Sequence, residues 1–498
     1  MSFNKPQLSF WQIWNMSFGF LGIQYSFGLQ QSAVNPIYSF LGANPDDLPF
    51  LNLAGPMTGL IIQPIIGAMS DKTWSTRWGR RKPYFLVGAV MCSVALFLFP
   101  FSRALWMAAG LLWILDAGNN TAMEPYRAFV ADKLPKEQYP TGFMMQSFFT
   151  GLGITLANIC LYFFEKKNLI VGKSNAGIPY WVYIAFFIGS VCSITTVIWS
   201  VSKTPEIPPT DEEYEEIKKK NEGLPHPMVQ FFMSILTTII AYIGIILMII
   251  PSLFSPGLLR RVMHRIDKNK TARLLFAQNI EIIEAIAEMP KVLWQLAAVY
   301  LFQWYAMFCY WQFVSHSVAE SVWHTTSREN PSLYGEASGW ASLLNASYNV
   351  VTFLSAFALA WYAKKIGPKW VHAASVTLAG LGLILLPHLE NKYMMFVSMI
   401  GLGIGWASMM GVPYLLVVNK IPKERYGVYM GIINMMIVLP MLLQTLTFGY
   451  IYKNLIGDKP THAILFAGAF LLIAALLTIF IKADKPTEET EVHFSGGH

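Results

Sequence analysis

Pro125-Tyr126 is followed along this chain by the run Asp132-Lys133-Leu134-Pro135-Lys136-Glu137 and then by Tyr139. The same pattern returns as Pro413-Tyr414, then Asn419-Lys420-Ile421-Pro422-Lys423-Glu424, then Tyr426. The offset is 288 residues, or 287 after a one-residue gap, and Gly79 and Gly367 also lie 288 residues apart. A fixed period this long predicts two homologous halves in parallel topology.

The composition around this repeat is that of a membrane protein. Of 498 residues, 54% are hydrophobic and only 13% are charged, and the mean hydropathy is +0.43. Soluble domains carry about a quarter charged residues. The apolar stretches are continuous and about 20 residues long, which favours helices over a barrel. We therefore expect an all-α membrane protein with twelve transmembrane helices in two six-helix bundles.

The charges indicate the orientation of these helices. With the N-terminus inside, 27 of the 36 Lys and Arg residues fall in cytoplasmic segments and 8 outside, and Arg127 lies within a span. This is the positive-inside pattern, so the net charge of +7 reflects orientation and not a nucleic-acid partner. The expected spans are 9–40, 48–70, 83–101, 104–131, 140–164, 179–200, 291–319, 335–362, 368–388, 391–418, 426–452 and 461–481.

This pattern predicts a multi-pass protein of the cell membrane, in a bacterium the inner membrane. The first span carries no clear cleavage site, so we expect it to be retained. The four cysteines all fall in apolar spans without metal or disulfide spacing. We expect a monomer in the lipid bilayer, without a cofactor or a metal.

The halves are expected at residues 1–200 and 291–482, with a cytoplasmic linker at 201–290 and a cytoplasmic tail at 483–498. Within the linker, residues 223–259 contain no Asp, Glu, Lys or Arg. A thirteenth crossing there would place the basic loops of the second half outside, against the charge bias. This segment is therefore expected to be interfacial or re-entrant on the cytoplasmic side.

A second segment of the linker, 271–289, has the periodicity of an amphipathic helix lying along a surface. The expected apolar face comprises Phe276, Ile280, Ile283 and Ala287. Glu281, Glu284 and Glu288 are expected largely off that face.

A loop with acid, glycine and arginines follows the second span. It reads Gly67-Ala68-Met69-Ser70-Asp71-Lys72, then Arg77-Trp78-Gly79-Arg80-Arg81-Lys82. The glycine permits close helix packing, and Asp71 with the arginines can form ion pairs in one conformation and break them in another. The spacing resembles the signature loop of the major facilitator superfamily, with Lys72 where Arg is usual. We therefore expect a gating loop made of Gly67, Asp71, Arg77, Gly79, Arg80 and Arg81, the alternative being a basic loop that serves orientation only.

The fourth span carries a polar stripe. Asp116 lies twelve residues from its outer end, near the middle of the membrane, where a charge costs at least ~3 kcal/mol. Arg127 shares its helix face, with Asn119, Asn120 and Glu124 on or near that stripe. Arg127 can pair with Asp116 or Glu124 or donate to sugar hydroxyls. Because it lies ~16 Å from Asp116 along the axis, we expect substrate or water to bridge the two, or Arg127 to pair across to another helix. A static buried ion pair is the alternative to a proton-carrying aspartate.

The run Asp116-x-x-Asn119-Asn120-Thr121-x-x-x-Pro125-x-Arg127-Ala128, together with the loop, resembles the plant sucrose–proton symporters and their animal and bacterial relatives. The resemblance covers nearly all the chain except 201–290. It implies that Asp116 carries the coupling proton and that Arg127 is required for transport. Plant members carry an acidic Asp-x-Asp motif after the seventh span, where this chain reads Phe313-Val314-Ser315-His316-Ser317. Sucrose itself is therefore not implied.

Sugar recognition uses hydrogen bonds to hydroxyl groups and flat apolar surfaces for the ring. Side chains of both kinds occur in the first and seventh spans, and we expect some to bind substrate and others only to pack. The candidates are Gln24, Tyr25, Gln30, Gln31, Gln303, Trp304, Tyr305, Trp311 and Gln312, with Gln146 of the fifth span.

Three functions follow from these features. The first is a proton-coupled symporter of a neutral disaccharide, such as maltose or sucrose. The second is a sodium-coupled glycoside symporter of the melibiose class. It is disfavoured because Asp116 and Glu124 are the only acids away from the span ends, and sodium sites use several oxygen ligands. The third is a non-transporting sugar sensor, for which a long signalling domain is expected instead of this short tail. We expect no enzyme, because no nucleophile–base pair or phosphate-binding loop is recognised.

Overall fold

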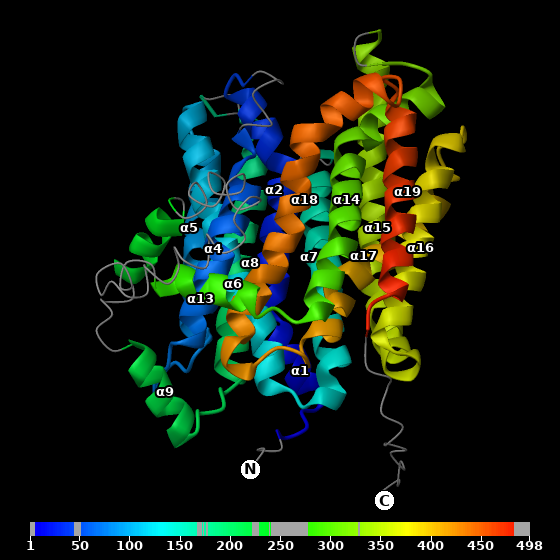
Figure 1. Cartoon of the computed structure of the whole chain (residues 1–498). Helices are drawn as coiled ribbons and strands as arrows, with labels where there is room; N and C mark the ends of the chain where they lie inside the picture. The colour runs from blue at the N-terminus through cyan, green and yellow to red at the C-terminus, as the bar shows by residue number, and fades with distance from the viewer. Residues whose placement is uncertain are drawn as a thin grey trace, which may run out of the picture.

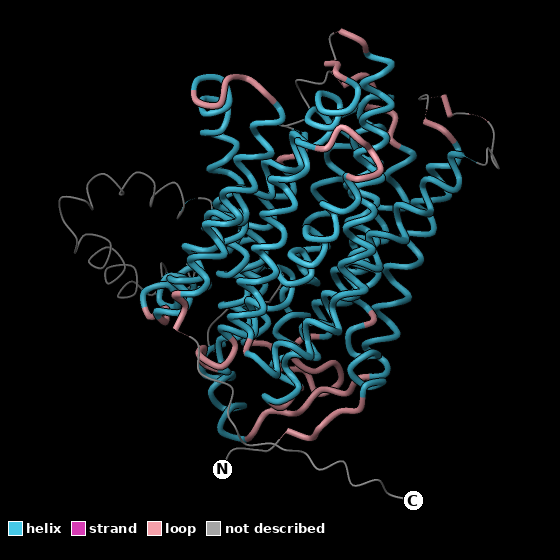
Figure 2. Tube along the Cα trace, turned by 90° about the vertical axis from the view of Figure 1, so that its right-hand side faces the viewer, coloured by secondary structure: helices cyan, strands magenta, loops and turns pink. Residues whose placement is uncertain are grey.

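The computed structural model describes residues 5–43, 51–166, 178–221, 229–238, 277–326 and 329–482, and the single positions 172, 174, 175 and 240. The tail 483–498 lies outside the described residues, as does most of the apolar stretch 223–259. The described chain is almost entirely helical, with loops gathered at its two ends (Figure 2).

Six spans form the N-terminal half. They are a first span broken into α1 (Phe10–Ser17) and α2 (Gly19–Phe40), then α4 (Ala54–Asp71), α5 (Lys82–Leu98), α6 (Leu105–Lys133), α7 (Tyr139–Lys166) and α8 (Tyr180–Lys203). Six more form the C-terminal half: α14 (Lys291–Trp323), α15 (Pro331–Ile366), α16 (Pro368–Leu385), α17 (Met395–Val417), α18 (Tyr426–Asn454) and α19 (Pro460–Ile479).

This arrangement confirms the expected all-α fold of twelve membrane-spanning helices in two bundles. Nine of the described helices are long and apolar enough to cross a membrane by composition alone. The remaining three spans, α2, α4 and α6, contain polar residues of the candidate functional site. The start of α1 and the end of α19 lie toward the same end of the molecule, which the charge bias identifies as the cytoplasmic end (Figure 1).

Local sequence sets where these helices begin and end. Ser9 and Gln12 form a reciprocal capping box at the start of α1. Asn330 accepts a hydrogen bond from the N–H of Leu333 (3.2 Å) ahead of Pro331, the first residue of α15. Gly367 adopts a φ of 91° between α15 and α16, a conformation that glycine takes without strain.

Two short linker helices lie near the cytoplasmic end. α9 (Asp211–Asn221) lies outside the bundle of spans in Figure 1, whereas α13 (Ala277–Ala287) runs across the spans. The expectation that Glu281 lies off the buried face of α13 is wrong, because Glu281 is only 7% exposed and pairs with Lys72, the residue directly after α4. Among the side chains described at 280–289, the buried ones are Glu281, Ile282, Ala285 and Met289, and the predicted face residues Phe276 and Ala287 lie outside the described side chains.

Part of the apolar linker stretch is described as a short helix, Val229–Thr238. Phe231 and Ile235 pack against Ile61, Ile65 and Met69 of α4. Ten residues are too few to cross a bilayer. The cytoplasmic location of 223–259 as a whole, like the domain boundaries at 200 and 290, stays a prediction.

Candidate functional site

Asp116 is fully buried on α6 and has one hydrogen-bond partner in the described structure. Its Oδ1 accepts a bond from Gln30 Nε2 of α2 at 2.9 Å, and its Oδ2 has no partner. Among the described residues, no lysine or arginine forms an ion pair with it, and Arg127, the arginine of the same helix, pairs with Glu124. An ionised carboxylate in such a place costs several kcal/mol, which binding a proton or a solute group relieves.

The next turn of α6 joins three helices. Asn119 donates to Ser26 Oγ of α2 at 3.1 Å and accepts from Cys92 of α5 at 3.0 Å. Asn120 donates to Thr58 Oγ1 of α4 at 2.9 Å and accepts from Gln63 of the same helix. The asparagines therefore fix the position of α6 within the N-terminal half. Gln63, the polar residue inside an apolar span, was not recognised from the sequence.

Arg127 forms its ion pair with Glu124 on its own helix, three residues away. Nη1 lies 2.7 Å from Glu124 Oε1. The guanidinium also lies over the ring of Tyr414 on α17, with Cζ 5.0 Å from the ring centroid. Of the pairings considered for Arg127, the structure contains the one with Glu124 and adds an aromatic partner from the other half.

An aromatic cluster lies in the C-terminal half around Trp406 of α17. The ring of Trp406 contacts Trp304 at 5.7 Å and Trp311 at 5.5 Å between centroids, and Tyr348 of α15 at 6.5 Å. Trp311 Nε1 donates to the Tyr348 hydroxyl at 3.4 Å. The buried indole N–H groups of Trp304 and Trp406 have no partner. Buried polar groups are normally hydrogen-bonded, so these two donors indicate a place for a polar solute or water.

Several predicted candidates make contacts within one half. Gln146 donates to the carbonyl of Tyr126 (3.0 Å), and Gln312 accepts from Gln444 (3.0 Å). Tyr305 bonds Thr447 (2.9 Å). Gln24 and Tyr25 are buried on α2, whereas Gln31 is exposed.

Gln303 lies within a buried polar network that the sequence did not reveal. Its Oε1 is 3.1 Å from Nε2 of His372 on α16, whose Nδ1 is 2.9 Å from Ser408 Oγ on α17. This network joins three helices of the C-terminal half. The role of the ten substrate candidates stays a prediction.

A cluster of contacts lies at the end that the charge bias identifies as cytoplasmic, and we call it the gate after the predicted gating loop; it comprises Asp71, Arg81, Asp132, Gly427 and Val428. Asp71 accepts the N–H groups of Gly427 and Val428, both at 3.0 Å, at the start of α18. Arg81 pairs with Asp71 at 2.6 Å and with Asp132 at 2.7 Å. Burial alone would lower the pKa of Arg81, but Asp132 and Asp71 raise it above its usual value. The gate thus links the N-terminal half to the C-terminal half through a fixed charge.

Other residues of the expected gating loop support this cluster. A Cβ on Gly67 would overlap the carbonyl oxygen of Gly427, so glycine is required for this approach of α4 to α18. Gly79 has a φ of 75°. The Glu206 carboxylate accepts the N–H groups of Arg80 (2.7 Å), Arg81 (2.9 Å) and Lys82 (3.0 Å). Arg77 is exposed and lies over the ring of Trp78.

The helix α13 joins both halves beside the gate. Glu281 pairs with Lys72 at the end of α4. Glu288 and Glu284 pair with Arg425 at 2.9 Å and 3.5 Å, and the Tyr429 hydroxyl donates to the carbonyl of Ala285 (3.1 Å). The linker therefore bridges α4 and the start of α18.

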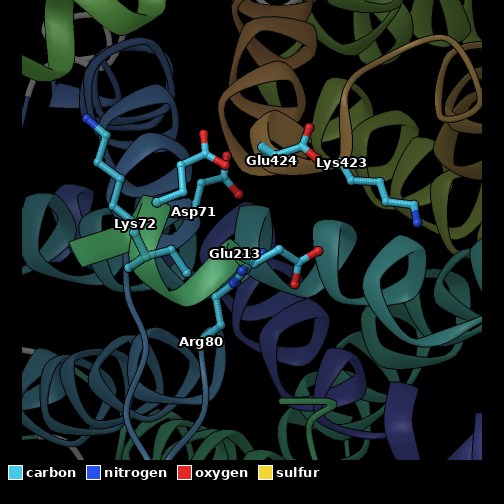
Figure 3. A pocket seen from close by; sticks show the side chains of 8 residues that line it. Asp71, Lys72, Arg80, Glu213, Lys423 and Glu424 are labelled. Carbon is cyan, nitrogen blue, oxygen red and sulfur yellow. The ribbon is translucent and has the colours of Figure 1, made fainter. Parts of the chain in front are cut away.

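A small pocket opens beside the gate. Figure 3 shows Asp71 of α4 with Lys72 directly after it, Glu213 of α9, and Lys423 and Glu424 before α18 around this pocket. Arg80, Glu216 and Ile217 complete the lining. Acidic and basic side chains are mixed, as in an interface between cytoplasmic elements.

Close contacts between the halves extend from the gate toward the middle of the membrane. On α4 and α18 they reach Gly59, whose carbonyl accepts from Asn434 at 3.1 Å. On α7, Ser147 donates to the carbonyl of Ala407 (2.7 Å), and Gly151 lies against Phe353 of α15. Gly59 is ~18 Å of helix rise from Asp71. These contacts close the molecule on its cytoplasmic side.

Comparison with known proteins identifies relatives for this architecture. A family model described as Major Facilitator Superfamily matches residues 16–445 and 296–497. The sucrose transport protein SUC3 of Arabidopsis thaliana is 21% identical over an alignment that covers 96% of this chain and 88% of that protein. The sucrose transport protein SUT1 of Oryza sativa subsp. japonica is 35% identical over an alignment of 133 positions that covers 22% of this chain and 24% of that protein.

Solved structures share the fold. The proton:xylose symporter XylE bound to 6-bromo-6-deoxy-D-glucose superposes with a TM-score of 0.60 at 14% identity, covering 96% of this chain and 97% of that one. The transporter FucP in its outward conformation gives a TM-score of 0.57 at 13% identity, covering 95% of this chain and 99% of that one.

Proposed function

The chain belongs to the major facilitator superfamily, and we propose that it works as a proton-coupled symporter of a neutral sugar. A disaccharide glucoside of the maltose or sucrose type is the proposed substrate. Transport proceeds by alternating access, with the structure described here closed on the cytoplasmic side.

One observation carries the proton coupling: Asp116 is a buried carboxylate without a cation, while the nearest arginine on its helix is held by Glu124. A proton neutralises such a carboxylate when it is closed off from water, and exposure to water on either side releases it. Asp116 is therefore the proposed proton carrier. Gln30 donates a hydrogen bond to the same carboxylate.

The aromatic cluster supports a sugar as the solute. Trp304, Trp311, Tyr348 and Trp406 offer flat apolar faces for a pyranose ring. The unpartnered N–H groups of Trp304 and Trp406 supply donors for sugar hydroxyl groups. Glu124 neutralises Arg127, so this arginine of the fourth span offers no free charge to an anionic solute.

The size and identity of the sugar rest on the relatives. The matched plant proteins are named sucrose transport proteins. Phe313 to Ser317 lie inside the seventh span, α14, and this stretch lacks the acidic motif expected of plant members. We therefore rank maltose slightly above sucrose.

Uptake by proteoliposomes with an imposed proton gradient tests the proposal. Accumulation of labelled maltose or sucrose above equilibrium, abolished by a protonophore, is the expected result. Transport of organic anions but no disaccharide would overturn the sugar, and dependence on sodium without protons would favour the sodium-coupled alternative. Asp458→Asn, at an exposed position with a φ of 58° that asparagine tolerates, provides a control for removing a carboxylate.

A further inference from the structure

Tyr414 belongs to one half of the molecule and packs inside the other. It sits on α17 of the C-terminal half and is 1% exposed. Its ring stacks on Phe143 of α7, with centroids 5.6 Å apart and planes 17° apart. On another side, the guanidinium of Arg127 lies 5.0 Å from the ring centroid. Both partners come from the N-terminal half.

The internal repeat contains a second Pro-Tyr pair, and its tyrosine does not pack inside the opposite half. Tyr126 is the counterpart of Tyr414 at the 288-residue offset. Its ring stacks on Phe85 at 4.1 Å, within its own half. The residue after it is Arg127, whereas the residue after Tyr414 is Leu415. Only the first of the two Pro-Tyr pairs is therefore followed by an arginine, and the tyrosine of the second pair packs against that arginine.

The chemistry of this contact depends on charge and on the ring face. A cation over an aromatic face is attracted by the ring quadrupole, and the attraction is stronger when both groups are out of water. Glu124 holds one edge of the guanidinium and leaves its flat face to Tyr414. Since Arg127 and Tyr414 belong to different halves, the contact must break when the halves separate on the cytoplasmic side.

We propose that Tyr414 is a positioning residue that holds Arg127 against Glu124 while the cytoplasmic side is closed, and releases it when that side opens. The arginine freed in this way becomes available to a solute or to the carboxylates of its own helix. The release of Arg127 has a role only if the proposed transport function holds, and the proposal rests on that function. The interactions that Arg127 of the fourth span makes would therefore depend on whether the gate is closed or open.

The test measures opening directly and uses no substrate. Ser147 is fully buried at the contact between the halves, so a Ser147→Cys reporter reacts with a maleimide only when they separate. The native cysteines Cys92, Cys160, Cys192 and Cys309 are first replaced. Labelling from the cytoplasmic side is then timed in inside-out vesicles for Tyr414→Leu and Tyr414→Phe.

Loss of the ring in Tyr414→Leu should speed labelling about tenfold, and Tyr414→Phe should restore the slow rate because the ring face is kept. With Arg127→Gln present, the leucine and phenylalanine variants should label alike. Phe143→Leu is the matched control, since it removes stacking without touching the cation.

An unchanged rate in Tyr414→Leu would overturn the proposal. So would an acceleration that persists undiminished in the Arg127→Gln background, because packing alone would then explain it. Thermal melting checks that each variant folds, and Tyr414→Met serves as a second ring-less variant if leucine does not. Failure to transport any disaccharide would refute the proposed substrate and leave this result unaffected.

Discussion

The carboxylate of Asp71 accepts the backbone N–H of Gly427 at 3.0 Å, which joins residues 356 positions apart and the two halves of the molecule. The same carboxylate pairs with Arg81 at 2.6 Å. A buried charge thus lies at the start of α18, where helix N–H groups have no partners of their own.

Asp71→Asn should weaken the closure of the cytoplasmic side. The amide keeps the size of the side chain but loses the charge, and breaking a buried ion pair costs about 3–5 kcal/mol. Labelling of the Ser147→Cys reporter from the cytoplasm should rise at least tenfold. Arg77→Gln changes an exposed charge in the same loop and should have no effect. Equal labelling of the two variants would show that the Asp71 bonds do not hold the gate.

Asp116→Asn should uncouple sugar movement from the proton. The amide mimics the protonated acid and keeps a hydrogen-bonding side chain beside Gln30, so exchange of labelled sugar across the membrane should continue. Accumulation driven by a proton gradient should be lost. Proton-driven accumulation at the wild-type level in this variant would rule out Asp116 as the carrier.

Arg127→Lys should fail to replace the arginine. An ammonium group has neither the planar fork that meets Glu124 nor the flat face that meets Tyr414. We expect the maximal transport rate to fall roughly 10- to 100-fold, which corresponds to a loss of about 1.4–2.7 kcal/mol. Full transport by the lysine variant would mean that charge alone matters at this position.

Trp406→Phe should weaken sugar binding while preserving the aromatic surface. The substitution removes a buried N–H without a partner, so the loss of one hydrogen bond predicts a rise in KM of roughly 3- to 10-fold. Trp361→Phe, at an exposed position on α15, is the control. An unchanged KM for every transported sugar would place the solute away from the aromatic cluster.

Glu281→Gln should loosen the connection between α13 and α4. The ion pair with Lys72 is almost fully buried, so its loss leaves a lysine without its carboxylate. Reporter labelling should accelerate, whereas Glu215→Gln, in an exposed pair with Lys218, should change nothing. Acceleration by both variants to the same extent would indicate a general charge effect on the linker.

The sequence predicted features that depend on local composition and on the repeat. Long apolar runs, the positive-inside bias and the 288-residue offset lead to twelve helices in two bundles, and the loop motif leads to Asp71 and Arg81. The stripe on the fourth span placed Glu124 within reach of Arg127, because residues three apart share a helix face.

Contacts between residues that are far apart in the sequence could not be predicted from local composition or from the repeat. Glu206 lies more than 120 residues from the N–H groups that it caps, and nothing local relates them. Tyr414 was visible as part of the repeat, yet its counterpart Tyr126 packs differently. Glu281 is buried because Lys72 meets it there, and periodicity alone assigns a carboxylate to the polar face.

The seam between α4 and α18 is built largely from glycine and backbone. Gly67 lies against Gly427, and Gly431 lies against Pro64. Long side chains lose up to about 2 kcal/mol of rotamer entropy when a surface orders them, whereas glycine and proline lose none. Bringing these two helices together therefore immobilises few side chains. The contact between α4 and α18 can therefore form and separate repeatedly with little change in side-chain conformational entropy.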